Sequence, residues 1–311
     1  MSATSTRFLL IFLDGVGLGE IGEENPLSVV RAMPALADYI EQPLIAGATL
    51  TRQNALLKGI DATLGIPGLP QSATGQTTIY TGQNAPAFLG RHQSGFANGS
   101  LRQLIDEFGL FKRAIALGHT ATLANAYSPE YFYAIANRKR RYSVCTLLNM
   151  TANLPFRMQY EYDQGEAVFW DITGEFSRSG KRCCRSISPK AAGKRLAELS
   201  GRYGITLFES YLSDFAGHAQ DKDRAISCLQ RIDVFLESAI AHLPPDVTLI
   251  ITSDHGNIED LSTKRHTLNK VPLIVVGSWA VAFSRARDLT DITPQILELL
   301  DSNFQTTSRS H

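Results

Sequence analysis

Cysteine is scarce in this chain, and neither sign of charge predominates. The four cysteines are Cys145, Cys183, Cys184 and Cys228; none forms a C-x-x-C pair, and no secretory signal precedes them. We therefore expect reduced thiols in a cytoplasmic protein. Lys plus Arg and Asp plus Glu number 30 each, so the formal net charge is zero. Nucleic acids and anionic membranes attract proteins with a basic excess, so neither is expected as the main partner.

The apolar run near the amino terminus, Phe8 to Leu13, is short and ends in Asp14. It is too short for the apolar region of a signal peptide and far too short to span a bilayer. We interpret it as the first strand of a buried core. With 311 residues, the chain has room for one large α/β domain or for a domain with a smaller insert.

The most informative stretch runs from Val247 to Gly277. It contains two apolar segments, Val247 to Thr252 and Val271 to Val276, which do not alternate with polar residues. This pattern is typical of strands that are covered on both faces. The connection between them carries three side chains that can bind metals: Asp254, His255 and His266. Open α/β sheets place ligand sites at the carboxyl ends of their strands, so we expect a site there.

Two other predicted strands are also followed by possible ligands. Phe8 to Leu13 leads into Asp14, and Ile205 to Tyr211 leads into Asp214 and His218. Asp214 and His218 can converge on one ion if the segment turns as a helix. Taken singly, Asp14 could equally cap a turn, and the Asp214 pair could be a satisfied surface pair.

A loop rich in Gly and Pro, from Gly65 to Gly82, ends in a short helical segment. We expect Thr77 in the first turn of that helix, where free backbone N–H groups favour a phosphate. The alternative is that Thr74, Thr77 and Thr78 only cap the helix.

Helical spacing is predicted near 26–42, 98–108, 188–199, 221–243 and 290–300, and a further buried strand near Arg113 to His119. From about Asn125 to Ser188 aromatic residues are interleaved with the basic run Arg138 to Arg141. We predict an inserted cap there, although it could begin near Ala87. The predicted division is a core at 1–125 and 189–301, a cap at 126–188, and a disordered tail at 302–311 in which His311 has no role.

Together the candidate ligands supply three imidazoles, three carboxylates and one hydroxyl: Asp14, Thr77, Asp214, His218, Asp254, His255 and His266. This mixture suits two borderline divalent ions such as Mn²⁺ or Zn²⁺, rather than Ca²⁺ or an iron–sulfur cluster.

The segments LLIFLDGVG, DFAGH and SDHGN, the Gly-Gln-Thr loop, and the later RHTLNKVPLIVVG resemble the metal-binding motifs of the alkaline-phosphatase-like superfamily. Within it they are most similar to cofactor-independent phosphoglycerate mutases, and less so to phosphopentomutases. The resemblance covers about 7–86 and 189–300, in the family's order. It implies a doubly wound, mostly parallel α/β sheet and a phosphoryl-transfer enzyme acting on a small phosphorylated metabolite.

The resemblance also implies roles for individual residues. One metal ion would be held by Asp214, His218 and His266, and the other by Asp14, Asp254, His255 and the Thr77 hydroxyl. Thr77 would be the nucleophile, forming a phosphothreonine, because a metal ion lowers the pKa of a bound hydroxyl. Asn257 and Thr267 would orient the ligands.

The chain departs from the mutases in two places. They have a serine followed by a Gly-His pair in the nucleophile loop, whereas Thr77 is followed by Thr-Ile-Tyr-Thr-Gly. The chain is also much shorter, and the missing length falls in the cap. We therefore keep a phosphodiesterase or nucleotide pyrophosphatase, and a non-catalytic metal-binding module, as alternatives. The predicted substrate contacts are Arg91, His92, Arg138, Arg140 and Arg141.

Overall fold

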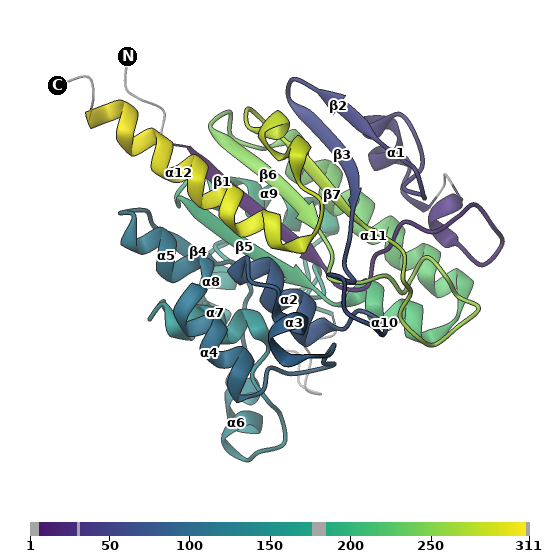
Figure 1. The fold of residues 1–311 in the computed structure, drawn as a ribbon, viewed down its shortest axis with the longest axis horizontal. Helices are drawn as coiled ribbons and strands as arrows, with labels where there is room; N and C mark the ends of the chain where they lie inside the picture. Colours follow the sequence, from purple (N-terminus) through teal and green to yellow (C-terminus); the bar gives the residue numbers. More distant parts are fainter. Residues whose placement is uncertain (1–5, 30–31, 176–184, 309–311) are drawn as a thin grey trace.

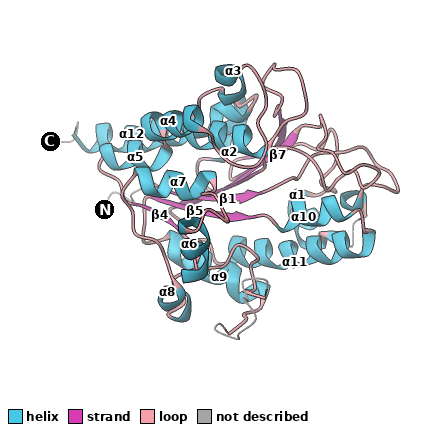
Figure 2. Ribbon diagram, turned by 90° about the horizontal axis from the view of Figure 1, so that it is seen from below, coloured by secondary structure: helices cyan, strands magenta, loops and turns pink. Residues whose placement is uncertain are grey.

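A seven-stranded sheet with helices on both faces forms the centre of the molecule (Figures 1 and 2). The computed structural model describes residues 6–29, 32–175 and 185–308, with the helical backbone alone from 302 onward. The sheet order is β2-β3-β7-β6-β1-β5-β4. The strands are β1 (Arg7–Leu13), β2 (Leu50–Arg52), β3 (Ala55–Ile60), β4 (Ala121–Leu123), β5 (Ile205–Ser210), β6 (Val247–Thr252) and β7 (Val271–Val276).

The middle of the sheet is parallel, as predicted. Strands β6, β1, β5 and β4 are parallel to one another. Beyond β6 the sheet continues with β7, β3 and β2, each antiparallel to the strand before it. Because β7 is antiparallel to β6, its amino end lies beside the carboxyl end of β6. Both ends of the connection 253–270 therefore meet at the edge of the sheet where β1 and β5 also end.

The central strands are mostly apolar because each of their faces is buried. In β1, Phe8, Leu10 and Phe12 belong to one hydrophobic core, and the residues between them belong to a second core on the opposite face. Successive side chains of a strand point to opposite faces, so this strand divides its side chains between the two cores. The predicted boundaries of β6 and β7 match the structure to the residue.

Each core is covered by its own helices (Figure 2). One face carries α2 (Ser72–Thr81), α3 (Ala85–Leu89), α4 (Gly99–Phe108), α5 (Leu110–Ala116), α7 (Val144–Thr151) and α12 (Ile292–Ser308). The other carries α1 (Pro34–Ile40), α9 (Pro189–Ser200), α10 (Leu212–Ala219) and α11 (Lys222–Ala241). Helices α6 (Pro129–Ala136) and α8 (Gln159–Asp163) lie at the margin, and short 3-10 helices occupy Pro26–Ser28, Ala280–Arg285 and Leu289–Asp291. None of the described helices has the length and apolar character needed to cross a membrane.

The predicted strand at Arg113 to His119 is wrong. Residues 113–116 belong to α5, in which Leu110, Phe111 and Ala114 are buried at helical spacing. Gly118, with φ at +86°, then turns the chain before β4. A short apolar run does not distinguish a buried helix from a buried strand, and here the helical contacts determine the outcome.

Two other elements differ from the prediction. The single helix expected near 26–42 is divided into a 3-10 helix and α1, because Pro34 has no N–H to continue a helix and instead begins one. The antiparallel hairpin of β2 and β3, joined by Gln53 and Asn54, was not predicted.

At the carboxyl end, α12 continues to Ser308, past the helix end predicted at Leu300. The added residues contain neither Gly nor Pro, so no strong stop signal interrupts the helix. Residues 309–311, including His311, lie outside the described residues.

The described part of the predicted cap packs closely on the sheet. Val144, Cys145 and Leu148 of α7 lie in the same core as β1 and β5. Arg157 is buried and donates hydrogen bonds to Thr122 Oγ1 on β4 and to the Tyr203 hydroxyl. This segment therefore belongs to the same hydrophobic core as one face of the sheet. The boundaries of the cap remain a prediction.

Candidate metal centre

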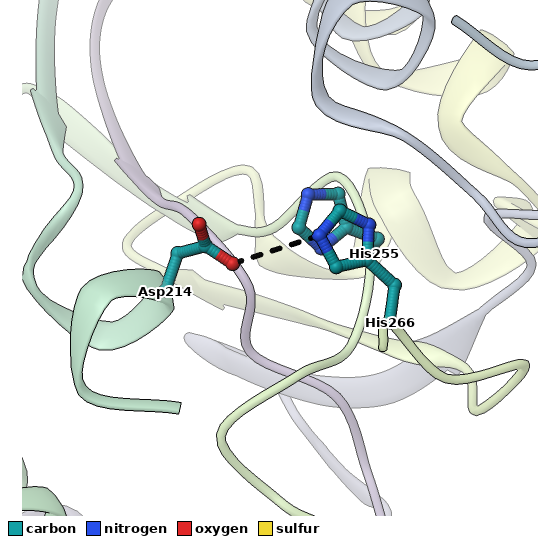
Figure 3. A group of neighbouring side chains, drawn as sticks. All are labelled: Asp214, His255 and His266. Atoms are coloured by element: carbon teal, nitrogen blue, oxygen red, sulfur yellow. Dashed lines mark ion pairs between the residues drawn. The ribbon is translucent and has the colours of Figure 1, made fainter. Parts of the chain in front are cut away.

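Four predicted ligands converge at the carboxyl ends of the strands. Asp14 follows β1, Asp254 and His255 follow β6, and Asp214 lies in the first turn of α10 after β5. His266, which precedes β7, reaches the same place (Figure 3). The structure forms two groups whose ligand atoms lie within 4.8 Å of one another: Asp14, Asp254 and His255, and Asp214, His255 and His266.

The first group is buried. His255 Nε2 lies 3.3 Å from Asp14 Oδ1 and 3.5 Å from Asp254 Oδ2. Burial, followed by the charge of Asp254, raises the pKa of Asp14 well above its ordinary value, and burial followed by the charge of Asp214 raises the pKa of Asp254. Burial, followed by the charge of His266, lowers the pKa of His255. The protein alone therefore favours neutral forms, whereas a divalent cation would favour two carboxylates and a neutral imidazole.

The second group is more open. His266 Nε2 lies 3.8 Å from Asp214 Oδ1, and the rings of His255 and His266 stack with their centroids 3.6 Å apart. His218 lies one helical turn from Asp214 on α10, with its Nε2 3.4 Å from Asp214 Oδ2. Its Nδ1 is 3.0 Å from the Lys264 carbonyl oxygen. The helix therefore brings Asp214 and His218 to one face, while His255 lies between the two groups.

These donors fit borderline divalent metal ions. Asp14 Oδ1 and His255 Nδ1 are buried without a hydrogen-bond partner among the described residues. Buried polar atoms are normally satisfied, and a cation held by this cluster would satisfy the Asp14 carboxylate. Imidazole and carboxylate together are a common donor set for Zn²⁺ and related ions.

The residues expected to orient the ligands contact the site through the loop after β6. Asn257 Nδ2 donates to Asp214 Oδ1 at 2.6 Å. The Thr267 hydroxyl donates to Glu259, which also accepts from Gly17 N at 2.9 Å and from Asn257 N at 2.8 Å. Glu259 therefore links the segments that carry Gly17, Asn257 and Thr267 through hydrogen bonds. Sequence reasoning missed it, although an acidic residue in the same loop as Asp254 was a signal.

The structure does not support Thr77 as a ligand or nucleophile. Helix α2 begins at Ser72, so Thr77 is in the second turn and not in the first. Its hydroxyl is fully buried and donates to the Ala73 carbonyl oxygen of the same helix at 2.6 Å. A hydroxyl held by its own helix in this way is not directed at the ligand groups.

Ser72 occupies the position predicted for Thr77. Its Oγ lies 3.0 Å from His255 Nε2, at the first residue of α2. The N-cap residue Gln71 makes no side-chain capping bond. Its side chain therefore does not block the first-turn amides. Serine directly after a loop rich in Gly and Pro was the missed signal, because serine is frequent at helix starts.

Two further polar residues lie against the site. Gln76 Nε2 lies 3.4 Å from Asp14 Oδ2 and 3.3 Å from Asp254 Oδ2. Glu209 is the penultimate residue of β5 and accepts a hydrogen bond from the Tyr211 hydroxyl, and burial raises its pKa to about 7. An acidic residue near the end of a mostly apolar strand was the sequence signal for Glu209.

The predicted substrate contacts lie in two segments. Arg91 and His92 adjoin Gln93, whose N–H donates to the Thr74 hydroxyl in the first turn of α2. Arg138, Arg140 and Arg141 lie on the connection between α6 and α7, and the Arg140 guanidinium lies 5.0 Å from the centre of the Tyr131 ring. The structure shows no substrate contact for any of them, so these roles remain predictions.

Comparisons with known proteins agree with this arrangement. Residues 187–303 match the family model described as Metalloenzyme superfamily. A 2,3-bisphosphoglycerate-independent phosphoglycerate mutase from Yersinia pestis (strain Pestoides F) is 34% identical over 137 residues, which are 40% of this chain and 27% of that protein. The chain thus spans about a quarter of the length of the curated relatives it matches.

Solved structures resemble the whole fold. Alkaline phosphatase from the Antarctic bacterium TAB5 covers 96% of this chain and 98% of its own, with a TM-score of 0.57 and 12% identity. Leishmania mexicana phosphoglycerate mutase covers 96% of this chain and 95% of its own, with a TM-score of 0.51 and 13% identity. These likenesses show the fold. The match to the Metalloenzyme superfamily model covers the part of this fold from residue 187 to residue 303, and the fold as a whole is similar to that of an alkaline phosphatase and a phosphoglycerate mutase.

Proposed function

We propose that this protein is a two-metal phosphoryl-transfer enzyme, a phosphatase or phosphomutase, acting on a small phosphorylated metabolite through Ser72. The observation that carries the proposal is the position of Ser72 Oγ, 3.0 Å from the imidazole that both ligand groups share. A hydroxyl at a helix start, beside two sets of metal ligands, has the position required of a nucleophile for phosphate esters.

The donors divide between two ions. Asp14, Asp254 and His255, with the Ser72 hydroxyl, would hold one ion, and Asp214, His218 and His266 would hold the other. Two divalent ions, Mn²⁺ or Zn²⁺, would neutralise the phosphoryl charge and lower the pKa of the attacking hydroxyl. The mixed imidazole and carboxylate donors support this choice of metals.

The chain's own residues supply the rest of the reaction. Thr74 N donates to the Gln93 carbonyl oxygen, so the amides of Ser72 and Ala73, with the positive end of the α2 dipole, bind the phosphoryl oxygens. Ser72 Oγ bonds to phosphorus as the ester oxygen leaves, and the serine proton passes to the leaving oxygen through solvent. The resulting phosphoserine transfers its phosphoryl group to water in a phosphatase, or to a second substrate hydroxyl in a mutase.

A phosphodiesterase or nucleotide pyrophosphatase is the second candidate, because the same metal ligands would serve diester hydrolysis. If the arginines between α6 and α7 contact the substrate, they suit a monoester with a further anionic group. Comparing rates on aryl monoesters and diesters separates the two, and a clear preference for diesters would reverse our choice.

The test of the nucleophile is a pair of variants in a phosphate-release screen. The screen covers sugar phosphates, phosphoglycerates, nucleotides and aryl esters, with added Mn²⁺ or Zn²⁺. We expect Ser72→Ala to lower turnover on the order of 10³-fold or more. Thr77→Val should keep turnover, and it should cost stability of only about 1 kcal/mol for the lost hydrogen bond.

Metal content is measured in both variants, so that a lost ion is not mistaken for a lost nucleophile. An active Ser72→Ala variant beside an inactive, folded Thr77→Val variant would return the nucleophile to Thr77. Binding of metal without turnover by the wild type, on monoesters and diesters alike, would favour a non-catalytic module.

A further inference from the structure

Helix α2 brings a second polar side chain to the metal centre, one helical turn beyond Ser72. Gln76 is buried, and its Nε2 lies 3.4 Å from Asp14 Oδ2 and 3.3 Å from Asp254 Oδ2. One amide nitrogen therefore faces the two carboxylates that follow two neighbouring strands, β1 and β6. A primary amide carries two hydrogens on that nitrogen, so it can donate one to each carboxylate.

Without such a donor the two neighbouring carboxylates would only repel each other when ionised. Both are buried, and the charge of Asp254 opposes ionisation of Asp14. Their other contacts are His255 Nε2, which lies 3.3 Å from Asp14 Oδ1 and 3.5 Å from Asp254 Oδ2, and Gly15 N, which donates to Asp254 Oδ1 at 3.4 Å. A neutral donor between the Oδ2 atoms holds both groups in one orientation without adding a charge that would compete with a cation.

The second group has an amide of its own. Asn257 Nδ2 donates to Asp214 Oδ1 at 2.6 Å and to the Asp214 carbonyl oxygen at 3.2 Å. Gln76 and Asn257 come from different segments, α2 and the loop after β6, and they contact different ligands. The centre thus has two side-chain amides. Gln76 contacts the two carboxylates of the first group, and Asn257 contacts Asp214, the carboxylate of the second.

We propose that Gln76 is a positioning residue that orients Asp14 and Asp254 for one metal ion, independently of Asn257, which orients Asp214 for the other. This inference rests on the proposed two-metal function, and it predicts that the two ions can be weakened separately. A residue that only fills space would not lower the affinity for one ion and leave the affinity for the other unchanged.

The experiment counts metal ions by native mass spectrometry during a Mn²⁺ titration of the metal-free protein. Gln76→Met, which keeps the length and removes the donor, should weaken one ion by roughly 10- to 100-fold and leave the other at wild-type affinity. Asn257→Leu should also weaken one ion, and the double variant should weaken both. Metal-free melting temperatures show whether each variant is folded.

If Gln76→Met does not fold, Gln76→Asn provides the test, because it keeps an amide that is too short to reach both carboxylates. Two ions at wild-type affinity in either folded variant would overturn the inference. It would also fail if each single variant weakened both ions equally. Failure of the proposed function is distinguishable, because it would appear as a wild type that binds no metal or that binds metal without turnover.

Discussion

Buried acidic side chains near the strand ends differ in how well they are satisfied. Glu259 accepts from three backbone or side-chain nitrogens and from the Thr267 hydroxyl. Glu209 is equally buried, but its hydrogen bonds from Cys145, Tyr211 and Ser143 do not offset the loss of solvation. A carboxylate in the second situation reduces stability whenever it is ionised.

Replacement of Glu209 by Gln should therefore stabilise the metal-free protein in a pH-dependent way. Burial raises the pKa of Glu209 from 4.5 to about 7, so the folded state binds its proton more tightly than the unfolded state. The stability that Glu209 contributes is present below pH 4.5 and is lost as the pH rises through 7. Glu209→Gln should then gain up to about 3 kcal/mol over wild type at pH 8.

Urea unfolding of both proteins at pH 5 and pH 8 measures this difference. The opposing titration of His255 is common to both proteins and cancels in the comparison. A gain of the same size at both pH values would mean that Glu209 is already ionised in the folded protein at pH 5.

The individual ligands were predictable because each follows a recognisable strand. Asp14, Asp254 and Asp214 come directly after apolar runs whose burial the sequence indicates. Ser72 and Gln76 were not found, because the start of a ten-residue helix in a loop rich in Gly and Pro has no strong cap. Their contacts with His255, Asp14 and Asp254 depend on how α2 packs on the sheet, which residue spacing does not express.

At the scale of elements, two glycines let helices approach their neighbours closely. A Cβ at Gly75 would lie 2.7 Å from Asp254 Cβ, where α2 meets the loop after β6. A Cβ at Gly193 would lie 2.1 Å from the Phe235 carbonyl oxygen, where α9 packs on α11. Both sites are too tight for a methyl group, but only the first adjoins the metal centre.

Alanine at these two positions should have different effects. Gly193→Ala should lower the free energy of unfolding by about 1 to 3 kcal/mol through overpacking, with metal affinity unchanged. Gly75→Ala should displace α2 from Asp254, and Mn²⁺ affinity should fall roughly tenfold or more. Urea unfolding and Mn²⁺ titration of both variants separate the effects. Wild-type metal affinity in Gly75→Ala would show that α2 does not set the ligand geometry.

The sequence predicted strands better than it predicted short helices. The central strands β1, β5 and β6 are mostly apolar and buried on both faces, which is a strong signal. The segment of helix α5 was predicted as a strand and strand β4 was not predicted, because seven or fewer residues contain too few periods to distinguish a helix from a strand. The β2–β3 hairpin adjoins β7 through pairing between distant parts of the chain, which local patterns do not show.

At the scale of the whole molecule, the topology of the sheet gathers the site. Strands β1, β5 and β6 are parallel, and β7 is antiparallel to β6, so the segments carrying all six candidate Asp and His ligands reach one edge. The fold matches an alkaline phosphatase over nearly the full length of both chains, whereas the sequence matches about a quarter of a phosphoglycerate mutase.

The measurement that tests the account most directly is the number of metal ions per chain. Purified protein is stripped with a chelator, reloaded with Mn²⁺ or Zn²⁺, and analysed for metal content beside Asp254→Ala. The account predicts two ions per wild-type chain, at most one in the variant, and a higher melting temperature for the loaded wild type than for the stripped protein. No bound metal in the wild type, or an unchanged count in Asp254→Ala, would contradict it.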